Sequence, residues 1–119
     1  MRLLVVVAAL SLFACGPTEG SACSTEAETA CGSATSLLSC EGGTWRGYAC
    51  PSCTGTTCNW KNAKSGDACP ASSAGDGWCP FNGRQVSCFF SSSADAGVFV
   101  ESACGKCVEG KTTDEVGGC

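Results

Sequence analysis

Cysteine content constrains this chain more than any other feature. Thirteen of the 119 residues are cysteine, and the twelve that follow Cys15 fall into two sets of six. The first set is Cys23, Cys31, Cys40, Cys50, Cys53 and Cys58, and the second is Cys69, Cys79, Cys88, Cys104, Cys107 and Cys119. In both sets eight residues separate the second and third cysteines, and two separate the fourth and fifth. This matching order predicts an internal repeat.

The residues beside these cysteines match as well. Gly20–Cys23 (GSAC) corresponds to Gly66–Cys69 (GDAC), and an aromatic residue stands five positions before the fourth cysteine of each set, Trp45 in one and Phe99 in the other. We therefore expect one unit over 23–58 and a second over 66–119. The segment 59–65 is expected to be a linker that lets the two units move semi-independently.

Few aliphatic residues are available for a conventional core. Beyond residue 15 the chain has two leucines, five valines and no isoleucine. Small domains of this kind depend on disulfides, each of which contributes roughly 2–4 kcal/mol. The sequence thus predicts a small disulfide-rich β fold that unfolds on reduction. Six cysteines allow fifteen connectivities in each unit, so the pairing is left open, although we expect it to stay within a unit.

Short β-prone runs separated by glycine predict an antiparallel β-meander in each unit. In the first unit, strand 36–40 is expected to turn through 41–43 into strand 44–49. In the second, 78–81 and 84–90 are expected to form a hairpin in which Asn82-Gly83 adopts a type I′ turn. The polar segment 91–97 predicts a longer loop before 98–100. Only 24–30 has a weak helical tendency.

The N-terminus has the features of an export signal. Residues 3–14 form an almost continuous apolar run behind Arg2, which is too short for a transmembrane helix of about 20 residues. The run ends in Leu12-Phe13-Ala14-Cys15, which resembles a bacterial lipobox. Twelve cysteines can pair completely, and the thirteenth, Cys15, then has a separate role.

The resemblance implies cleavage before Cys15 and lipidation of Cys15, with 1–14 as the signal peptide. It also implies attachment to the membrane, because two or three acyl chains anchor a protein stably. Gly16 follows Cys15 where an aspartate would favour the inner membrane, so an outer-membrane location in the cell envelope is expected. Residues 15–22 are expected to be the lipidated cysteine and a flexible tether. The whole chain is similar to cysteine-rich tandem-repeat lipoproteins of Gram-negative bacteria.

Several kinds of chemistry lack the residues that they need. The net charge is −4 and there is no histidine, so a nucleic-acid partner is not expected and the commonest general base is missing. The C-x-x-C pairs Cys50/Cys53 and Cys104/Cys107 have the spacing of redox or metal sites, yet no helical pattern surrounds Cys50 and about fifty residues separate the pairs. We expect no metal, no cofactor and no enzymatic activity. Asp114-Glu115 is expected to be solvated surface.

Aromatic residues are the remaining candidates for ligand contact. Trp45, Trp78 and Phe99 stand beside or near cysteines in expected strands, which favours packing over the disulfides. Trp60 in the linker and the Phe89-Phe90 pair are the possible ligand contacts, since strand alternation turns one of the two phenylalanines outward.

These observations favour a surface or periplasmic binding or adhesion module with a glycan or a cell-envelope protein as its partner. The alternatives are a structural, protease-resistant envelope lipoprotein without a specific ligand, and, less favoured, a thiol-disulfide oxidoreductase.

Overall fold

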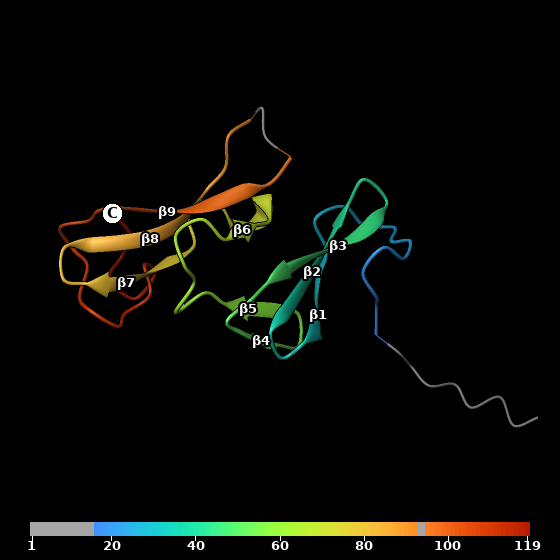
Figure 1. Cartoon of the computed structure of the whole chain (residues 1–119), viewed down its shortest axis with the longest axis horizontal. Coiled ribbons are helices and arrows are strands. Elements are labelled where there is room, and N and C mark those ends of the chain that lie inside the picture. Colours follow the sequence, from blue (N-terminus) through green and yellow to red (C-terminus); the bar gives the residue numbers. More distant parts are fainter. Residues whose placement is uncertain (1–15, 93–94) are drawn as a thin grey trace, which may run out of the picture.

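The computed structural model describes residues 16–92 and 95–119 (Figure 1). The Leu12–Cys15 motif and the apolar run before it lie outside the described residues. Within them the strands are β1 (Thr29–Ser33), β2 (Ser36–Glu41), β3 (Thr44–Ala49), β4 (Ser52–Thr54), β5 (Thr57–Asn59), β6 (Ala68–Cys69), β7 (Gly77–Phe81), β8 (Arg84–Phe89) and β9 (Gly97–Ala103), with one 3-10 turn, η1 (Ala71–Ser73). No helix in this part of the chain has the length and hydrophobicity to cross a membrane.

The first unit contains a three-stranded antiparallel sheet in the order β1-β2-β3 and a two-stranded hairpin, β4-β5. The turn between β2 and β3 consists of Gly42 and Gly43, which both have positive φ, the conformation that glycine adopts most easily. Strands 36–40 and 44–49 are therefore confirmed. Residues 24–30 form no helix, because Ala27 takes a φ of 66° and donates its N–H to the carbonyl of Cys40 in β2.

The second unit contains a four-stranded antiparallel sheet in the order β6-β9-β8-β7. The expected hairpin is present, with Phe81 opposite Arg84 across Asn82-Gly83. The expected turn type is wrong, since a type I′ turn needs positive φ at both residues and only Gly83 has it. Asn82 is held by a tertiary contact instead, because its side-chain Oδ1 accepts the N–H of Glu109 at 2.8 Å.

Six disulfides join the twelve cysteines, and every bridge lies within one unit. Both units use the same connectivity, in which the first cysteine pairs with the third, the second with the fifth and the fourth with the sixth. The pairs are Cys23–Cys40, Cys31–Cys53, Cys50–Cys58, Cys69–Cys88, Cys79–Cys107 and Cys104–Cys119. The expectation of a small, disulfide-rich antiparallel β fold is confirmed.

Backbone hydrogen bonds repeat between the units as well. Gly20 donates to the carbonyl of Trp45 at 2.8 Å, and Gly66 donates to the carbonyl of Phe99 at the same distance. The donor glycine of each bond lies within a four-residue turn, at 18–21 in the first unit and at 64–67 in the second. Residues 18–22, which we expected to be part of a tether, are therefore hydrogen-bonded into the first unit.

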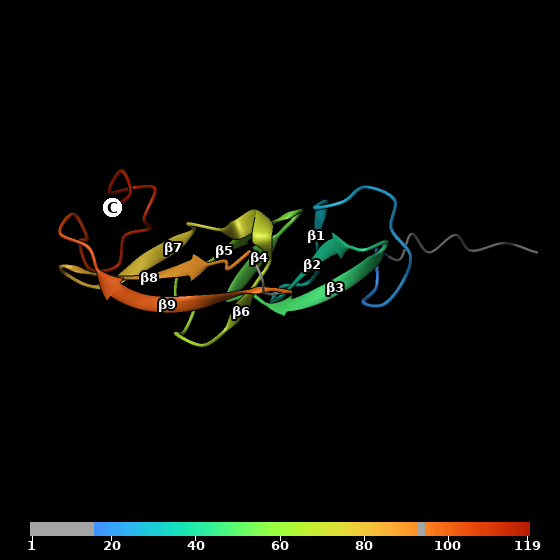
Figure 2. The same cartoon turned by 90° about the horizontal axis from the view of Figure 1, so that it is seen from above.

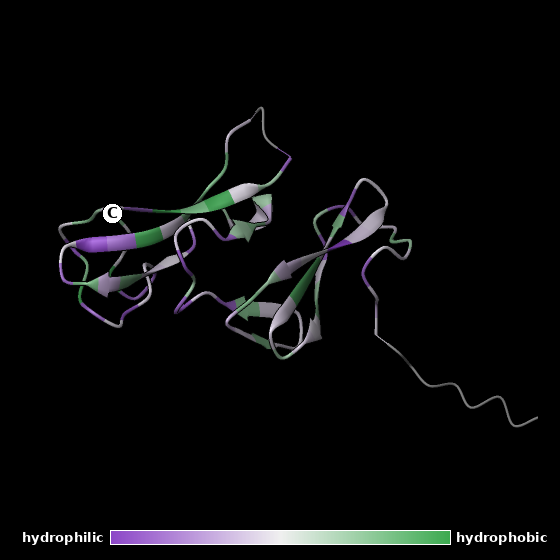
Figure 3. Cartoon of the chain, in the orientation of Figure 1, coloured by the Kyte–Doolittle hydropathy of each residue, from purple (hydrophilic) through white to green (hydrophobic). Residues whose placement is uncertain are grey.

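A shared core joins the two units. One buried cluster includes Leu37 and Tyr48 of the first unit, Val86 and Phe99 of the second, and Trp60 of the connecting segment. The sheets follow each other along the long axis of the molecule (Figure 2), and the most hydrophobic part of β9 lies toward the first unit (Figure 3). The connecting segment is thus packed, which argues against the expected semi-independent movement.

Candidate functional site

The three aromatic residues proposed as ligand contacts lie in different environments. Trp60 is only 5% exposed, and its ring centroid is 5.0 Å from that of Phe99. Phe89 is 62% exposed. In the sheet Phe89 is opposite Val98, one position along from the buried Phe99, and neighbouring strand positions point to opposite faces. Trp60 and Phe89 therefore lie on opposite sides of the β8-β9 sheet.

The three residues proposed as ligand contacts therefore have different roles in the structure. A buried ring offers little surface to a ligand, so Trp60 is a core residue, although it also lines a cavity. Phe90 is half-buried and lines a separate hollow that contains Ala71 and Asp95. Trp45 and Phe99 are buried, as expected, while Trp78 is half-buried and donates its indole N–H to the Ala63 carbonyl at 2.8 Å.

The C-x-x-C pairs do not form bridges within themselves. Cys50 is bonded to Cys58 and Cys53 to Cys31, while Cys104 is bonded to Cys119 and Cys107 to Cys79. Each motif therefore contributes to two different disulfides.

A cleft between the two units is lined by two carboxylates, those of Asp76 and Asp114. A cavity of about 190 Å³ and a neighbouring one of about 180 Å³ share Thr57, Trp60 and Asp76 in their walls. We call the pair the inter-unit cleft. Its polar and aromatic lining includes Thr57, Trp60, Ser73, Asp76, Thr113 and Asp114.

The walls of the cleft come from both units and from the segment between them. Trp60 directly follows β5 and is buried in the shared core. Asp76 lies between η1 and β7, where its backbone donates to the Ser73 carbonyl at 2.9 Å and accepts the N–H of Cys88 at 2.8 Å. The Asp76 carboxylate is thus carried on a backbone that is fixed at both its N–H and its carbonyl.

The opposite wall comes from the segment 108–118, which folds back over β7. Cys79 donates to the Lys111 carbonyl at 2.8 Å and Thr113 donates to the Gly77 carbonyl at 3.0 Å. The Thr113 hydroxyl also lies 3.3 Å from the Gly77 carbonyl and is buried. These bonds hold the next residue, Asp114, in the lining of the cleft, where its charge acts on Asp76.

The electrostatics of the cleft are unusual because its charges are not balanced. Burial raises the pKa of the Asp76 carboxyl above its ordinary value, and the charge of Asp114 raises that pKa further. Within 16–92 and 95–119 the ion pairs are Arg46–Glu41, Arg84–Glu101 and Lys111–Glu115, and none includes either cleft carboxylate.

The neighbouring Glu115 shows the contrast. Hydrogen bonds from Thr112 lower the pKa of the Glu115 carboxyl, and the charge of Lys111 adds to the effect. Glu115 is thus a partnered surface acid, whereas Asp76 and Asp114 remain available as hydrogen-bond acceptors for a ligand.

Sequence reasoning missed Asp76. The expectation that Asp114 and Glu115 are solvated surface is confirmed, since both residues are exposed, and Asp114 also lines the cleft. Asp76 and Asp114 are 38 positions apart and no motif connects them. The available signal was the long gap between the fifth and sixth cysteines of the second unit, which contains eleven residues where the first unit has four.

Three comparisons with known proteins add no relative: no protein-family model, curated protein or solved structure matches this chain.

Proposed function

We propose that this chain is an outer-membrane-anchored lipoprotein that acts as a binding module of the cell envelope, with the inter-unit cleft as its binding site. The anchor in this proposal is Cys15, on the strength of the lipobox-like motif. The observation that carries the binding role is the pair of carboxylates, Asp76 and Asp114, which line a polar cleft and have no ion-pair partner within 16–92 and 95–119.

The chemistry of the cleft favours a neutral or amine-bearing glycan as the ligand. Carboxylates accept hydrogen bonds from sugar hydroxyls and ammonium groups, and charge-assisted hydrogen bonds are the stronger kind. Threonine and serine hydroxyls of the lining add donors and acceptors. Two carboxylates at the same site would repel an acidic polysaccharide.

The position of the first unit fits a partner that lies close to the membrane. The backbone turn at 18–21 begins only three residues after Cys15, and three residues span at most about 10 Å. In this proposal the first unit therefore stays near the lipid headgroups, and the glycan belongs to the neighbouring envelope.

Calorimetric titration with soluble chitosan oligosaccharides, which carry amines and no carboxylates, tests the binding role. Wild-type protein is expected to bind, and Asp114→Asn is expected to weaken binding about tenfold or more, because a hydrogen bond to a charged group contributes roughly 1.5–3 kcal/mol. Glu109→Gln is the matched control, since it removes the same charge from an exposed residue outside the cleft lining. Equal loss in both variants would assign the effect to net charge.

The structural alternative makes the opposite prediction. A protease-resistant envelope protein without a specific ligand would give no heat with any glycan, while its disulfides would still protect it from proteolysis. The anchor is tested separately by the intact mass of membrane-extracted protein. The expected mass is that of residues 15–119 with three acyl chains, and an unlipidated mass would refute the anchor.

A further inference from the structure

Cys119 differs from the other bridged cysteines in its exposure. It is the only exposed one of the twelve, and the rest are buried or half-buried. Its partner Cys104 is buried, being only 3% exposed. Thiol–disulfide exchange begins with attack by a thiolate on a sulfur that it can reach. In the described chain, a thiol in solution therefore reaches the Cys104–Cys119 bridge most easily from the Cys119 side.

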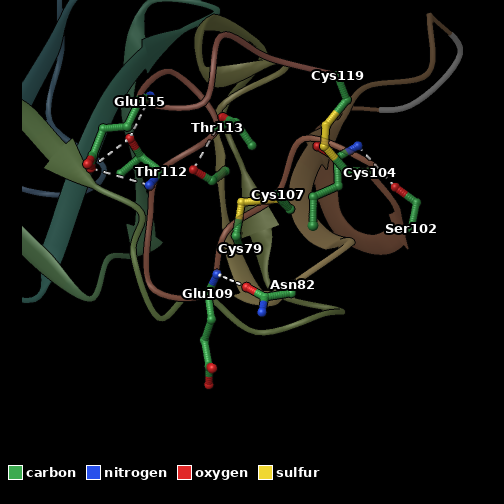
Figure 4. The surroundings of a disulfide bond; sticks show 12 residues. Cys79, Asn82, Ser102, Cys104, Cys107, Glu109, Thr112, Thr113, Glu115 and Cys119 are labelled. Atoms are coloured by element: carbon green, nitrogen blue, oxygen red, sulfur yellow. Dashed lines mark hydrogen bonds between the residues drawn. A yellow bond between two sulfur atoms is a disulfide. The ribbon is translucent and has the colours of Figure 1, made fainter.

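A third sulfur lies beside this bridge. The Sγ atoms of Cys104, Cys107 and Cys119 all lie within 4.8 Å of one another, and no other three cysteines in 16–92 and 95–119 are grouped in this way. Cys107 belongs to the neighbouring Cys79–Cys107 bridge. Figure 4 shows the Cys79–Cys107 bridge between Asn82 and Thr113, and the Cys104–Cys119 bridge on the side of Ser102.

The backbone between Cys104 and Cys107 is already shaped for a direct bridge. Cys107 donates its N–H to the Cys104 carbonyl at 3.0 Å, which closes a turn. The Cα atoms at the two ends of such a turn lie less than about 7 Å apart, within reach of a disulfide. At the equivalent position in the first unit, Cys53 donates to the Ala34 carbonyl, so this turn distinguishes the second unit.

We propose that Cys119 is a thiol–disulfide exchange site for small thiols and that it passes the exchange to the Cys79–Cys107 bridge. A thiolate bonds to Sγ of Cys119, the Cys104–Cys119 bond breaks, and Cys104 leaves as a thiolate. Cys104 then attacks Sγ of Cys107, the Cys79–Cys107 bond breaks, and Cys79 leaves as a thiolate that takes a proton from water. Two disulfides are present before and after, so no oxidant or reductant is required.

Peptide mapping of the folded full chain tests both steps. The protein, with any free thiols first blocked, is incubated with reduced glutathione at pH 8, quenched with acid, alkylated and digested. The expected products carry glutathione on Cys119 and the alkyl group on Cys79, and they form roughly tenfold faster than any product at the counterpart bridge Cys50–Cys58, because access governs exchange rates. Products that form equally fast at both bridges would overturn the proposal.

A variant separates the two steps. The double change Cys79→Ser with Cys107→Ser removes the receiving bridge, so the alkyl group is expected on Cys104. If wild-type protein also carries it only on Cys104, the transfer step is refuted. If the variant fails to fold, wild-type protein still tests the transfer step, because the alkyl group is found either on Cys79 or on Cys104. The matched control is Cys50→Ser with Cys58→Ser, which should leave the rate at Cys119 unchanged. This test is independent of glycan binding, so the two proposals can fail separately.

Discussion

Replacement of Trp60 by alanine should uncouple the two units. The indole is 5% exposed and packs against Phe99 in the cluster that also contains Leu37 of the first unit. Burying a large aromatic side chain removes roughly 150–250 Å² from water, which at about 25 cal/mol per Å² corresponds to roughly 4–6 kcal/mol. Measured aromatic-to-alanine changes in protein cores cost about 3–5 kcal/mol. We therefore expect a loss of about 4 kcal/mol.

Each unit keeps its three disulfides in this variant, so we expect the lost stability to separate the two units and to leave each unit folded. Thermal unfolding followed by near-ultraviolet circular dichroism should show a lower midpoint, and small-angle scattering should show a larger radius of gyration. Trp45→Ala is the control, because Trp45 is similarly buried but packs in a different cluster, with Leu38 and Cys40. A loss below about 1 kcal/mol with unchanged scattering would refute the shared core, because it would mean that the ring contributes no buried packing.

Three further variants test local features. Ala27→Gly should raise thermal stability by about 0.5–1 kcal/mol, because the left-handed conformation costs alanine about 1–2 kcal/mol and glycine loses part of that gain to entropy. Gly97→Ala should cost about 1–3 kcal/mol, since its Cβ would lie 2.9 Å from Sγ of Cys69; an unchanged melting midpoint would contradict the packing. Asp114→Asn should stabilise the protein by about 0.2–1 kcal/mol at neutral pH. A raised pKa for the Asp76 carboxyl in the folded state means that its charge costs stability above that pKa, and the cost disappears as pH falls toward the unfolded value. The benefit of Asp114→Asn should therefore shrink in acid, and denaturant titrations at several pH values would show whether it does.

Much of the local structure could be predicted because short-range chemistry determines it. Gly42 and Gly43 specify the β2-β3 turn through their tolerance of positive φ. The aromatic residues five positions before a cysteine are buried, since Trp45 pairs with Cys40 and Phe99 with Cys88 across the strands. In these cases neighbours along the chain or across one hairpin supply the decisive contacts.

The sequence-based predictions were wrong or left open where contacts between residues far apart in the sequence determine the structure. Asn82 takes its conformation with a bond to Glu109, which no hairpin rule includes. Trp60 stands in a polar segment with the composition of a linker, and only the approach of the two sheets shows that it is buried. Disulfide connectivity is of the same kind, because spacing alone does not reveal which cysteines meet.

The cleft depends both on what the two units share and on where they differ. The two units have the same disulfide connectivity and the same four-residue turn, at 18–21 in the first and at 64–67 in the second. Duplication therefore provides two scaffolds of the same kind. The second copy adds residues between its fifth and sixth cysteines, and this segment hydrogen-bonds to β7, which would otherwise be an open edge strand. Covering that edge brings Asp114 to Asp76, at a cost in charge repulsion that no cation in the described chain offsets. One unit alone could not form this site, because Thr57 and Asp76 come from opposite sides of the Trp60 segment. Packing of Trp60 is therefore a condition for the cleft, and this is the physical reason why loss of the shared core should also abolish the glycan binding that we propose.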